Sequence, residues 1–313
     1  MNPKMQVSDA AEYLGVTIQA IHKNIKTNQL ETSKSQNKMY FGHKTAKEIF
    51  KLDILPTCFT WQNLKGGVGK TNLSFATAAR LASYGLEVLV IDLDQQGNFT
   101  QACGVDAEDK PVMFDIIKDN INISDCIINI HEGLDLLPSR IENALLDNLF
   151  AVNGLPVDRE LKKRISPLKK HYDIIFIDCP PSLSSSVCAA TLCADYVILP
   201  TDPEKFSLSG LQITLNEIKK NISERYDIHV NIKILLNKFD GRTNLSHQVL
   251  TALLSDEKFN SKLFKSFIRT SQEFPNSISK GTSIFDSLKP STAKEDIDLL
   301  CHELIDLCKK DEM

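Results

Sequence analysis

The glycine-rich segment Lys65–Thr71, which reads Lys-Gly-Gly-Val-Gly-Lys-Thr, constrains the fold of this chain more than any other. Glycines let the backbone curl until several N–H groups point at one anion, and a lysine and a hydroxyl at the end of such a loop suit phosphate oxygens and Mg²⁺. The segment lies between a β-rich run, Cys58–Gln62, and a helix-like run, Asn72–Tyr84. A simple glycine turn is the alternative, but the strand-loop-helix context favours a nucleoside triphosphate site. The candidate nucleotide-binding residues here are Lys65, Gly66, Gly67, Val68, Gly69, Lys70, Thr71 and Asn72.

Three carboxylates end two further strand-like runs. Leu86–Asp94 ends in Asp92 and Asp94, which are two residues apart and therefore lie on the same side of an extended strand end. Tyr172–Pro181 contains Asp178, which is followed closely by a rigid Pro-Pro pair. An aspartate after a strand is often only the N-cap of the next helix, but three of them behind one phosphate loop favour a catalytic site.

The chemistry of a bound triphosphate assigns roles to these side chains. One carboxylate is needed to hold hydrated Mg²⁺ and another to position the attacking water. We expect Thr71, Asp178 and Asp94 to form the metal set, with Asp94 also positioning the water and Asp92 supporting it. The predicted catalytic residues are Lys65, Lys70, Asp92 and Asp94.

Beyond the loop, helix-like and strand-like runs alternate. This alternation predicts an α/β fold with a mostly parallel doubly wound sheet and ligands at the carboxyl ends of the strands. With the phosphate loop, the expected fold is of the P-loop NTPase kind. The predicted helices are 72–84, 184–194, 208–223, 246–255 and 293–308, and the predicted strands are 88–91, 134–137, 174–177, 196–200 and 230–236.

Length and composition indicate a cytoplasmic protein. The 313 residues suit one α/β domain with a small appendage. No apolar run reaches the ~18 residues that a membrane span needs, and there is no secretory N-terminus. The cysteines lack C-x-x-C spacing, so we expect reduced thiols. The eight cysteines are Cys58, Cys103, Cys126, Cys179, Cys188, Cys193, Cys301 and Cys308.

The first 56 residues differ from the rest in charge. The net charge of the whole chain is −4, whereas residues 1–56 contain eight lysines against five carboxylates, a net charge of +3, which leaves −7 for residues 57–313. A negative chain binds nucleic acid only through local basic patches. We therefore expect residues 1–56 to form a DNA-binding domain and linker, and residues 57–313 to form the nucleotide-binding domain.

The pattern of residues 1–56 supports this hypothesis. Ser8 is placed to cap a helix through Leu14, Gly15 to break it, and Thr17 to cap a second helix through Lys26. This spacing is typical of a helix-turn-helix. A plain helical cap on the nucleotide-binding domain is the alternative.

A β-wing is predicted to follow, because Leu30–Phe41 alternates around Ser35-Gln36-Asn37. The whole arrangement resembles the MerR-like winged helix-turn-helix, which implies contact with operator DNA and repression of the protein's own operon. The residues expected to face the major groove are Gln19, His22, Lys23 and Lys26.

Four motifs in order resemble those of the ParA-type partition ATPases, which are related to the MinD-like ATPases. They are Lys65–Thr71, Asp92–Asn98, Ile177–Ser182 and Asp240–Ser246, and the resemblance covers roughly 59–307. Lys65 gives the phosphate loop the form of a deviant Walker A motif.

Three residues depart from the pattern of that family. Gln95 stands where the family usually has proline. The loop after Asp94, which is the first switch loop of that family, therefore lacks the fixed φ that a proline would give it. Asn72 and Leu64 replace the more usual threonine and glutamine. None of the three removes a charged group from the site.

The resemblance implies a weak ATPase that uses ATP and Mg²⁺ as a timed switch. ATP would be held between two subunits, with each Lys65 reaching the partner's phosphates, and the homodimer would bind nonspecific DNA on the nucleoid until a ParB-like centromere-binding protein stimulates hydrolysis. The residues expected on the basic surface are Arg242, Lys258, Lys262, Lys265, Arg269 and Lys280.

The base is expected to be adenine by the same resemblance. Asn237 follows a strand where the family often places an amide facing the base, and Pro275 lies in the segment that packs near it. Asn237-Lys238 with Asp240 also resembles the guanine-binding motif of GTPases, so the choice between bases stays open.

Three other functions remain as alternatives. A MinD-like membrane-associated ATPase would need a basic amphipathic terminal helix, but 293–313 carries mixed charge, so no membrane contact is expected. A nucleotide-sensing transcriptional repressor is the second alternative. An iron–sulfur branch, using Cys103 or Cys179, is disfavoured by the cysteine spacing.

Overall fold

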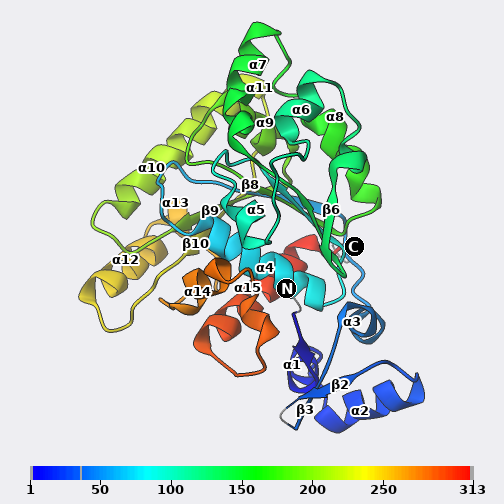
Figure 1. Ribbon diagram of the computed structural model, residues 1–313. Helices are drawn as coiled ribbons and strands as arrows, with labels where there is room; N and C mark the ends of the chain where they lie inside the picture. Colours follow the sequence, from blue (N-terminus) through cyan, green and yellow to red (C-terminus); the bar gives the residue numbers. More distant parts are fainter. Residues whose placement is uncertain (1–2, 36, 311–313) are drawn as a thin grey trace.

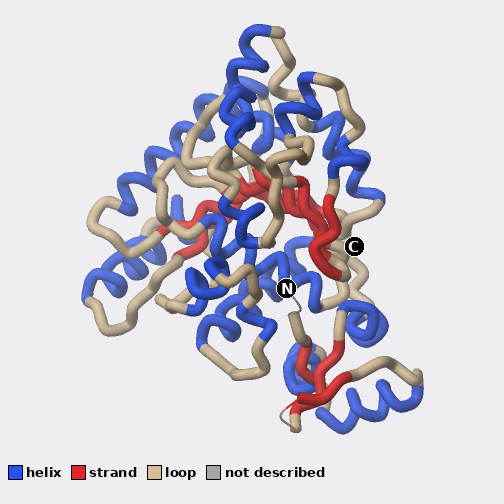
Figure 2. Tube along the Cα trace, in the orientation of Figure 1, coloured by secondary structure: helices blue, strands red, loops and turns tan. Residues whose placement is uncertain are grey.

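The computed structural model describes residues 3–35 and 37–310 and is built around a central sheet (Figures 1 and 2). The strands of this sheet are β4 Thr57–Trp61, β5 Val88–Asp92, β6 Ile128–His131, β7 Leu134–Leu137, β8 Ile174–Asp178, β9 Tyr196–Thr201 and β10 Ile232–Leu236. They lie in the order β10-β9-β4-β8-β5-β7-β6, and all neighbours run parallel except β6, which is antiparallel to β7. The predicted α/β fold with a mostly parallel sheet is confirmed.

The three central strands bring the sequence motifs to one edge. Every residue of β4, β5 and β8 is buried, which explains their continuous apolar runs, since parallel strands are covered on both faces. In the register of these strands Trp61 lies opposite Asp178, and Asp178 lies opposite Asp92. The phosphate loop and both carboxylate segments therefore leave the sheet side by side.

Helices cover both faces of the sheet (Figure 2). The α-helices of this part are α4 Lys70–Ser83, α5 Asn98–Ala102, α6 Met113–Lys118, α7 Leu146–Val152, α8 Lys162–Ile165, α9 Ser185–Cys193, α10 Ser207–Ile218, α11 Glu224–Tyr226, α12 Asn244–Ser255, α13 Glu257–Asn260, α14 Glu273–Ser279 and α15 Thr292–Cys308. The shorter elements are the 3-10 helices η1 Ile123–Cys126, η2 Ile141–Leu145, η3 Ser166–Lys170 and η5 Ile284–Asp286, and the π-helical turn η4 Lys219–Ser223.

The bounds of the predicted helices and strands agree with these to within a few residues. One predicted helix differs in its type. The helix predicted over 208–223 is α-helical only to Ile218 and continues as the π turn η4. The stretch 98–170 was not predicted in detail, apart from its strand 134–137. Its helices are at most seven residues long, too short to show a clear 3.6-residue period.

The N-terminal module, residues 3–56, folds around its own small sheet. Its elements are β1 Met5–Gln6, α1 Val7–Tyr13, α2 Ile18–Thr27, β2 Ser33–Ser35, β3 Lys38–Phe41 and α3 His43–Phe50, with the strand order β1-β3-β2. The predicted cap of the second helix is confirmed, because Thr17 accepts a hydrogen bond from the N–H of Ala20 at 3.2 Å. The predicted turn at Ser35-Gln36-Asn37 includes Gln36, which lies outside the described residues.

The cap predicted for the first helix is wrong. Gln6 occupies the N-cap position of α1, and Ser8 is already the second helical residue. The hydroxyl of Ser8 donates instead to the carboxylate of Asp9 at 3.1 Å. Pairing of β1 with β3 fixes the chain at Met5 and Gln6, so the N-cap position of α1 falls at Gln6, two residues before Ser8.

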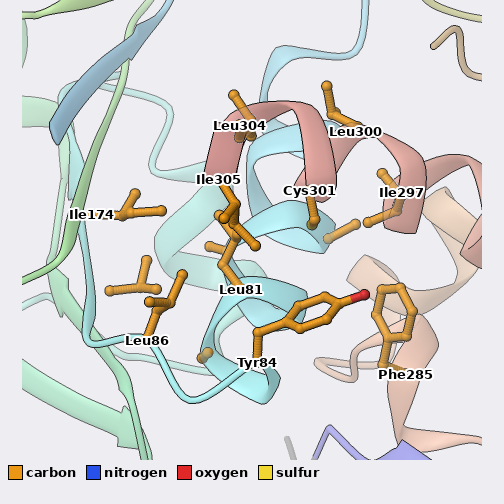
Figure 3. Packing of buried hydrophobic residues seen from close by; sticks show 14 of the residues in the cluster. Leu81, Tyr84, Leu86, Ile174, Phe285, Ile297, Leu300, Cys301, Leu304 and Ile305 are labelled. Atoms are coloured by element: carbon orange, nitrogen blue, oxygen red, sulfur yellow. The ribbon is translucent and has the colours of Figure 1, made fainter. Parts of the chain in front are cut away.

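The N-terminal module and the sheet domain share one apolar core. Phe41 and Phe50 of the module belong to the same buried cluster as Leu81 of α4 and Tyr84, the C-cap of that helix. On the other side of α4, the cluster continues to α15 and η5 (Figure 3). The boundary predicted at residue 56 therefore divides the sequence but not the hydrophobic core.

A buried arginine adds a polar link across the same contact. Arg80 on α4 is fully buried, and its guanidinium donates to Asp298 of α15 at 2.9 Å and to Asp9 of α1 at 3.0 Å. The ring of Phe285 lies 4.4 Å from the guanidinium carbon. Removing one partner of a buried pair costs about 3–5 kcal/mol, so α1, α4 and α15 are held as a unit.

The packing of α15 makes a testable prediction. Leu300 is fully buried, whereas its neighbour Leu299 is 54% exposed. Leu300→Ala is expected to lower the free energy of unfolding by about 2–5 kcal/mol, because it leaves a cavity between α15 and α4. Leu299→Ala, the matched control, should change it by no more than about 0.5 kcal/mol. Urea denaturation measures both, and similar losses in the two variants would contradict this packing.

Candidate nucleotide-binding site

The loop after β4 borders a large hollow. This hollow measures about 800 Å³ and is lined by the phosphate loop, the start of α4, the loop after Asp94 and the segment 269–278. Gly67 and Gly69 have φ values of +74° and +92°, a left-handed conformation that favours glycine. A Cβ atom on Gly69 would lie 2.4 Å from the amide nitrogen of Asn237, so the close approach also requires glycine.

Lys70 and Thr71 begin α4 at the base of the hollow. Lys70 is 7% exposed, and burial lowers its pKa while the charges of Asp178 and Asp94 act in the opposite direction. The hydroxyl of Thr71 donates to Asp178 at 2.8 Å, and Ser74 donates to the other carboxylate oxygen at 3.3 Å. A lysine and a helix N-terminus at this position attract phosphate oxygens.

Asp178 is a fully buried carboxylate of the site. It is fully buried at the end of β8, and burial raises its pKa to about 7, against the hydrogen bonds from Thr71 and Ser74 and the charge of Lys70. A divalent cation beside it would favour the charged form. Thr71 and Asp178 are thus the residues that fit a Mg²⁺ ion shared with phosphates and waters, the manner in which Mg²⁺ usually binds.

No group of three or more His, Cys, Asp or Glu side chains that could hold a metal occurs within residues 3–35 and 37–310. Such a cage is not what Mg²⁺ requires beside phosphates, because one or two carboxylates suffice there. The third residue of the predicted metal set, Asp94, lines the hollow but is not hydrogen bonded to Thr71 or Asp178 within that part of the chain.

Asp92 and Asp94 differ in what they contact. Asp92 is fully buried and accepts hydrogen bonds from the N–H and the hydroxyl of Thr100, at 3.0 and 2.7 Å, and from the N–H of Asp94 at 3.1 Å. Asp94 lines the hollow, and its carboxylate accepts a hydrogen bond from the N–H of Gln96 at 3.0 Å. Asp92 is thus placed to hold the loop in shape, whereas Asp94 faces the space for substrate.

Asn237 and Lys238 brace the phosphate loop from the end of β10. The side-chain amide of Asn237 donates to the carbonyl of Val68 at 2.8 Å, and Lys238 donates to the carbonyl of Gly67 at 2.6 Å. Asn237 also lines the hollow, as does Pro275 on the far wall. The amide of Asn237 is therefore engaged by the loop and is not simply directed at a base.

The guanine alternative finds little support in the position of Asp240. Its carboxylate is held by the guanidinium of Arg242 at 2.8 and 2.9 Å, and these hydrogen bonds lower the pKa of Asp240 to about 2. Asp240 is also absent from the lining of the hollow. A carboxylate that reads guanine would have to leave Arg242 and turn toward the base.

Lys65 points away from the hollow. Its ammonium group lies 2.6 Å from Asp202 and 2.6 Å from Glu204, both in the loop after β9, and 3.4 Å from the hydroxyl of Ser207. Burial acts to lower the pKa of Lys65, but these hydrogen bonds raise it overall. The two lysines of the phosphate loop thus occupy different places, with Lys70 inside the site and Lys65 tethered at its rim.

The predicted DNA-contact residues fall into two separate regions. Gln19, His22, Lys23 and Lys26 are all exposed on α2, which lies far from the sheet in Figure 1. Arg242, with a side chain 88% exposed, precedes α12, and Lys265 is exposed near the edge strand β10. Lys262 is partly buried and donates to the carbonyl of Lys258.

Arg269 fits the basic surface poorly. Its guanidinium donates to Asp296 at 2.6 and 2.9 Å and to Glu295 at 3.1 Å, and it also lines the nucleotide hollow. Two carboxylates on α15 already neutralise it. Its more evident role is to join the segment after β10 to α15.

Sequence reasoning missed several residues that shape the site. Thr100 and Ser139 support the carboxylate loop, and Asp202 and Glu204 hold Lys65. Asp202 follows a predicted strand end, the same signal that identified Asp92 and Asp178. The other three lack any such signal, because they reach the site only through tertiary packing.

Comparisons with known proteins agree with this geometry. The AAA domain family matches residues 57–234. The sporulation initiation inhibitor protein Soj of Bacillus subtilis is 33% identical over 225 residues, which cover 71% of this chain and 87% of Soj. The chromosome-partitioning ATPase Soj of Thermus thermophilus is 32% identical over 225 residues, which cover 71% of this chain and 84% of that protein.

A solved structure has a similar fold. The putative plasmid partition protein of Borrelia burgdorferi B31 bound to AMPPNP matches with a TM-score of 0.66 and 25% identity, covering 80% of this chain and 98% of that one. Fold and phosphate loop together define a P-loop nucleotide-binding protein. The chain belongs to the AAA domain family and, within it, to the ParA/MinD-type P-loop ATPases that include Soj.

Because Lys65 and Lys70 lie in different places, we expect their substitution to affect nucleotide binding differently. Lys70→Ala is expected to weaken binding of a fluorescent ATP analogue by about ten- to a hundredfold, because a hydrogen bond to a charged group contributes roughly 1.5–3 kcal/mol. Lys65→Ala should change the affinity of the monomer by less than about threefold, because Lys65 lies outside the hollow. Equal losses in both variants would show that Lys65 enters the site of its own subunit.

Proposed function

We propose that this protein is an ATP-dependent partition ATPase, which positions a DNA molecule or another cargo by switching between nucleotide states. The observation that carries the proposal is the pair of lysines on one phosphate loop, one inside the hollow and one held at its rim by Asp202 and Glu204. The Soj relatives and the Borrelia plasmid partition protein support it.

Hydrolysis of ATP to ADP and phosphate would follow from the residues that line the hollow. Lys70 and the N-terminus of α4 bind the phosphates, and Thr71 and Asp178 hold Mg²⁺, which neutralises charge on the phosphates. Asp94 positions the attacking water from the facing loop. The carboxylate of Asp94, aligned by one backbone N–H, would activate the attacking water only modestly, which suits a slow intrinsic turnover of ATP.

If ATP binding brings two subunits together, Lys65 would act at the nucleotide of the partner subunit. The cis contacts with Asp202 and Glu204 hold the lysine at the edge of the site, where a second subunit could approach. In the ATP homodimer, Lys65 exchanges these carboxylates for the partner's phosphates, where charge develops during hydrolysis. Release of phosphate removes that attraction and lets the subunits part.

DNA would bind at two places with different chemistry. The basic surface around Arg242 and Lys265 would contact phosphates without reading sequence, which keeps the dimer on the nucleoid in the cytoplasm. The exposed face of α2 would read operator DNA in the major groove, in the manner of a winged helix-turn-helix. A ParB-like centromere-binding protein would stimulate hydrolysis and release the dimer.

A MinD-like membrane ATPase is less favoured by the terminal helix. Within the described residues no helix is long and apolar enough to cross a bilayer. The inner face of α15 is packed into the core, and its exposed side includes Glu295 and Asp306. Those carboxylates would oppose adsorption to anionic lipid. Liposome-stimulated hydrolysis that exceeds DNA-stimulated hydrolysis would instead favour this alternative.

Asp94 provides the central test of hydrolysis. Asp94→Ala is expected to lower ATP turnover by about 10²–10⁴-fold, the usual contribution of a group that assists proton transfer, while ATP binding and dimerisation persist. Asp109→Ala, at an exposed position outside the hollow, is the control and should turn over normally. Phosphate release and light scattering measure the two properties. Normal turnover in Asp94→Ala would move the role to another group.

The two DNA activities should separate by substitution. Deleting residues 1–56 would expose the shared core around Tyr84, so point variants are the cleaner experiment. Lys23→Ala with Lys26→Ala should abolish binding to DNA from upstream of the protein's own gene and spare ATP-dependent binding to random duplexes. Arg242→Ala with Lys265→Ala should spare operator binding and weaken ATP-dependent binding to random duplexes, with the salt slope reduced by about 2, roughly 1 for each lost phosphate contact.

Lys163→Ala is the matched control for both pairs, because Lys163 is exposed on α8 and pairs with Glu160 away from either region. Electrophoretic mobility shift assays at several salt concentrations compare the variants. Loss of both activities in the α2 double variant would place all DNA affinity in the N-terminal module.

A further inference from the structure

Asp202 is a buried carboxylate that lies near two lysines. It follows β9, and its side chain is 2% exposed. Its Oδ1 atom accepts hydrogen bonds from Lys65 at 2.6 Å and from the hydroxyl of Ser207 at 2.9 Å. Its Oδ2 atom lies 4.0 Å from the ammonium group of Lys238. Asp202 therefore has one lysine in contact and a second lysine within reach.

The register of two neighbouring strands brings Lys238 to this carboxylate. The ends of β9 and β10 are paired, with Thr201 opposite Leu236. Asp202 and Lys238 follow these ends closely, so they leave the same edge of the sheet (Figure 1). Lys238 has a φ of +54°, a left-handed conformation that is unfavourable for most residues with a side chain. The side chain of Asn237 stabilises this conformation, because it accepts a hydrogen bond from the N–H of Lys238 at 2.8 Å.

The ammonium group of Lys238 is only partly engaged. It donates to the carbonyl of Gly67 at 2.6 Å, but an ammonium group has three N–H donors. The side chain is 49% exposed, which leaves it room to rotate. Within residues 3–35 and 37–310, Asp202 is the carboxylate that pairs with Lys238. A small rotation would bring the two groups from 4.0 Å into hydrogen-bond distance.

Departure of Lys65 would leave Asp202 without its nearest cation. Lys65 is proposed above to leave Asp202 and Glu204 for the phosphates of a second subunit. The side chain of Glu204 is 64% exposed, so water can replace the lysine there. Asp202 is buried, and removing one partner of a buried ion pair is strongly destabilising because the remaining charge is uncompensated. The exchange of Lys65 between subunits therefore needs a replacement cation at Asp202.

We propose that Lys238 is this replacement, a positioning residue that pairs with Asp202 when Lys65 leaves and so allows Lys65 to reach the second subunit. The inference rests on the proposed function, because that function makes Lys65 leave. Lys238 binds the phosphate loop in the monomer and turns to Asp202 in the ATP dimer. Asp202 then has a lysine partner in both states.

A double-mutant cycle tests the replacement in the protein without nucleotide. Lys65→Ala and Lys238→Gln should each lower the melting temperature by less than about 2 °C, because the other lysine still compensates Asp202. The double variant should lose at least about 4 °C more than the sum of the two losses, because the buried carboxylate is then unpaired. Additive losses overturn the proposal.

Asp202→Asn shows whether the coupling passes through this carboxylate. In that background the losses from Lys65→Ala and Lys238→Gln should add to within about 1 °C, since the amide carries no charge. Coupling that persists there overturns the proposal, because the lysines would then interact through the phosphate loop. Lys219→Gln is the control for loss of a positive charge, since Lys219 is 74% exposed and pairs with Glu224. It should be additive with Lys65→Ala.

Dimerisation on ATP tests the consequence for the switch. In the Asp94→Ala background, Lys238→Gln should raise the protein concentration needed for half-dimerisation at least about tenfold, because Lys65 then leaves an unpaired carboxylate behind. Lys238→Arg should stay within about threefold of the parent, because arginine keeps the charge. Light scattering at increasing protein concentration measures both. Unimpaired dimerisation of Lys238→Gln overturns the proposal.

The affinity of the monomer for a fluorescent ATP analogue separates the replacement from damage to the phosphate loop. Lys238→Gln should lower this affinity by less than about fivefold, because glutamine keeps a donor for the carbonyl of Gly67. A loss of monomer affinity as large as the loss of dimerisation overturns the proposal, since Lys238 would then act through nucleotide binding. Wild-type protein tests the proposed function separately. If it stays monomeric with ATP while the cycle shows coupling through Asp202, the partition switch is refuted and the pairing of Lys238 with Asp202 stands.

Discussion

The parallel register of β4, β8 and β5 is the constraint on which the rest of the structure depends. It sets Trp61, Asp178 and Asp92 in one row across the sheet, so three segments far apart in sequence leave the same edge together. The hydrogen bond from Thr71 to Asp178 then ties the start of α4 to the end of β8. A shift of one residue in either strand pair would turn a carboxylate toward the opposite face. Strand pairing therefore fixes the site before any ligand arrives.

The phosphate loop is held from outside as well as from beneath. Asn237 and Lys238 bind its carbonyl groups from β10, and Asp202 and Glu204 bind Lys65 from the loop after β9. These contacts order the loop without filling the hollow. A preorganised loop loses less entropy on binding phosphate. The same arrangement leaves Lys65 attached only to its own subunit, so any role toward another subunit requires it to exchange partners.

The N-terminal module is coupled to the nucleotide site through α4. This helix begins at Lys70 and Thr71. Near its other end, Arg80 and the C-cap residue Tyr84 pack against α1 and α15. A single helix of 14 residues thus spans from the phosphate loop to the module. The module is not free to tumble relative to the sheet. This explains why the domain boundary, so clear in composition, is not a boundary in the core.

The sequence by itself determined the phosphate loop, the carboxylates at the strand ends and the α/β alternation, because these depend on local spacing and on apolar runs that need no partner. It could not determine the N-cap of α1, which lies at Gln6 and not at Ser8 because of strand pairing, nor the helices between 98 and 170, which are too short to show a period. Only the tertiary structure decided that Lys65 is held in cis, that Arg269 is neutralised by α15, and that Asn143 supports Asp94. Each of these contacts joins groups from distant parts of the chain, and no local sequence pattern predicts such a contact.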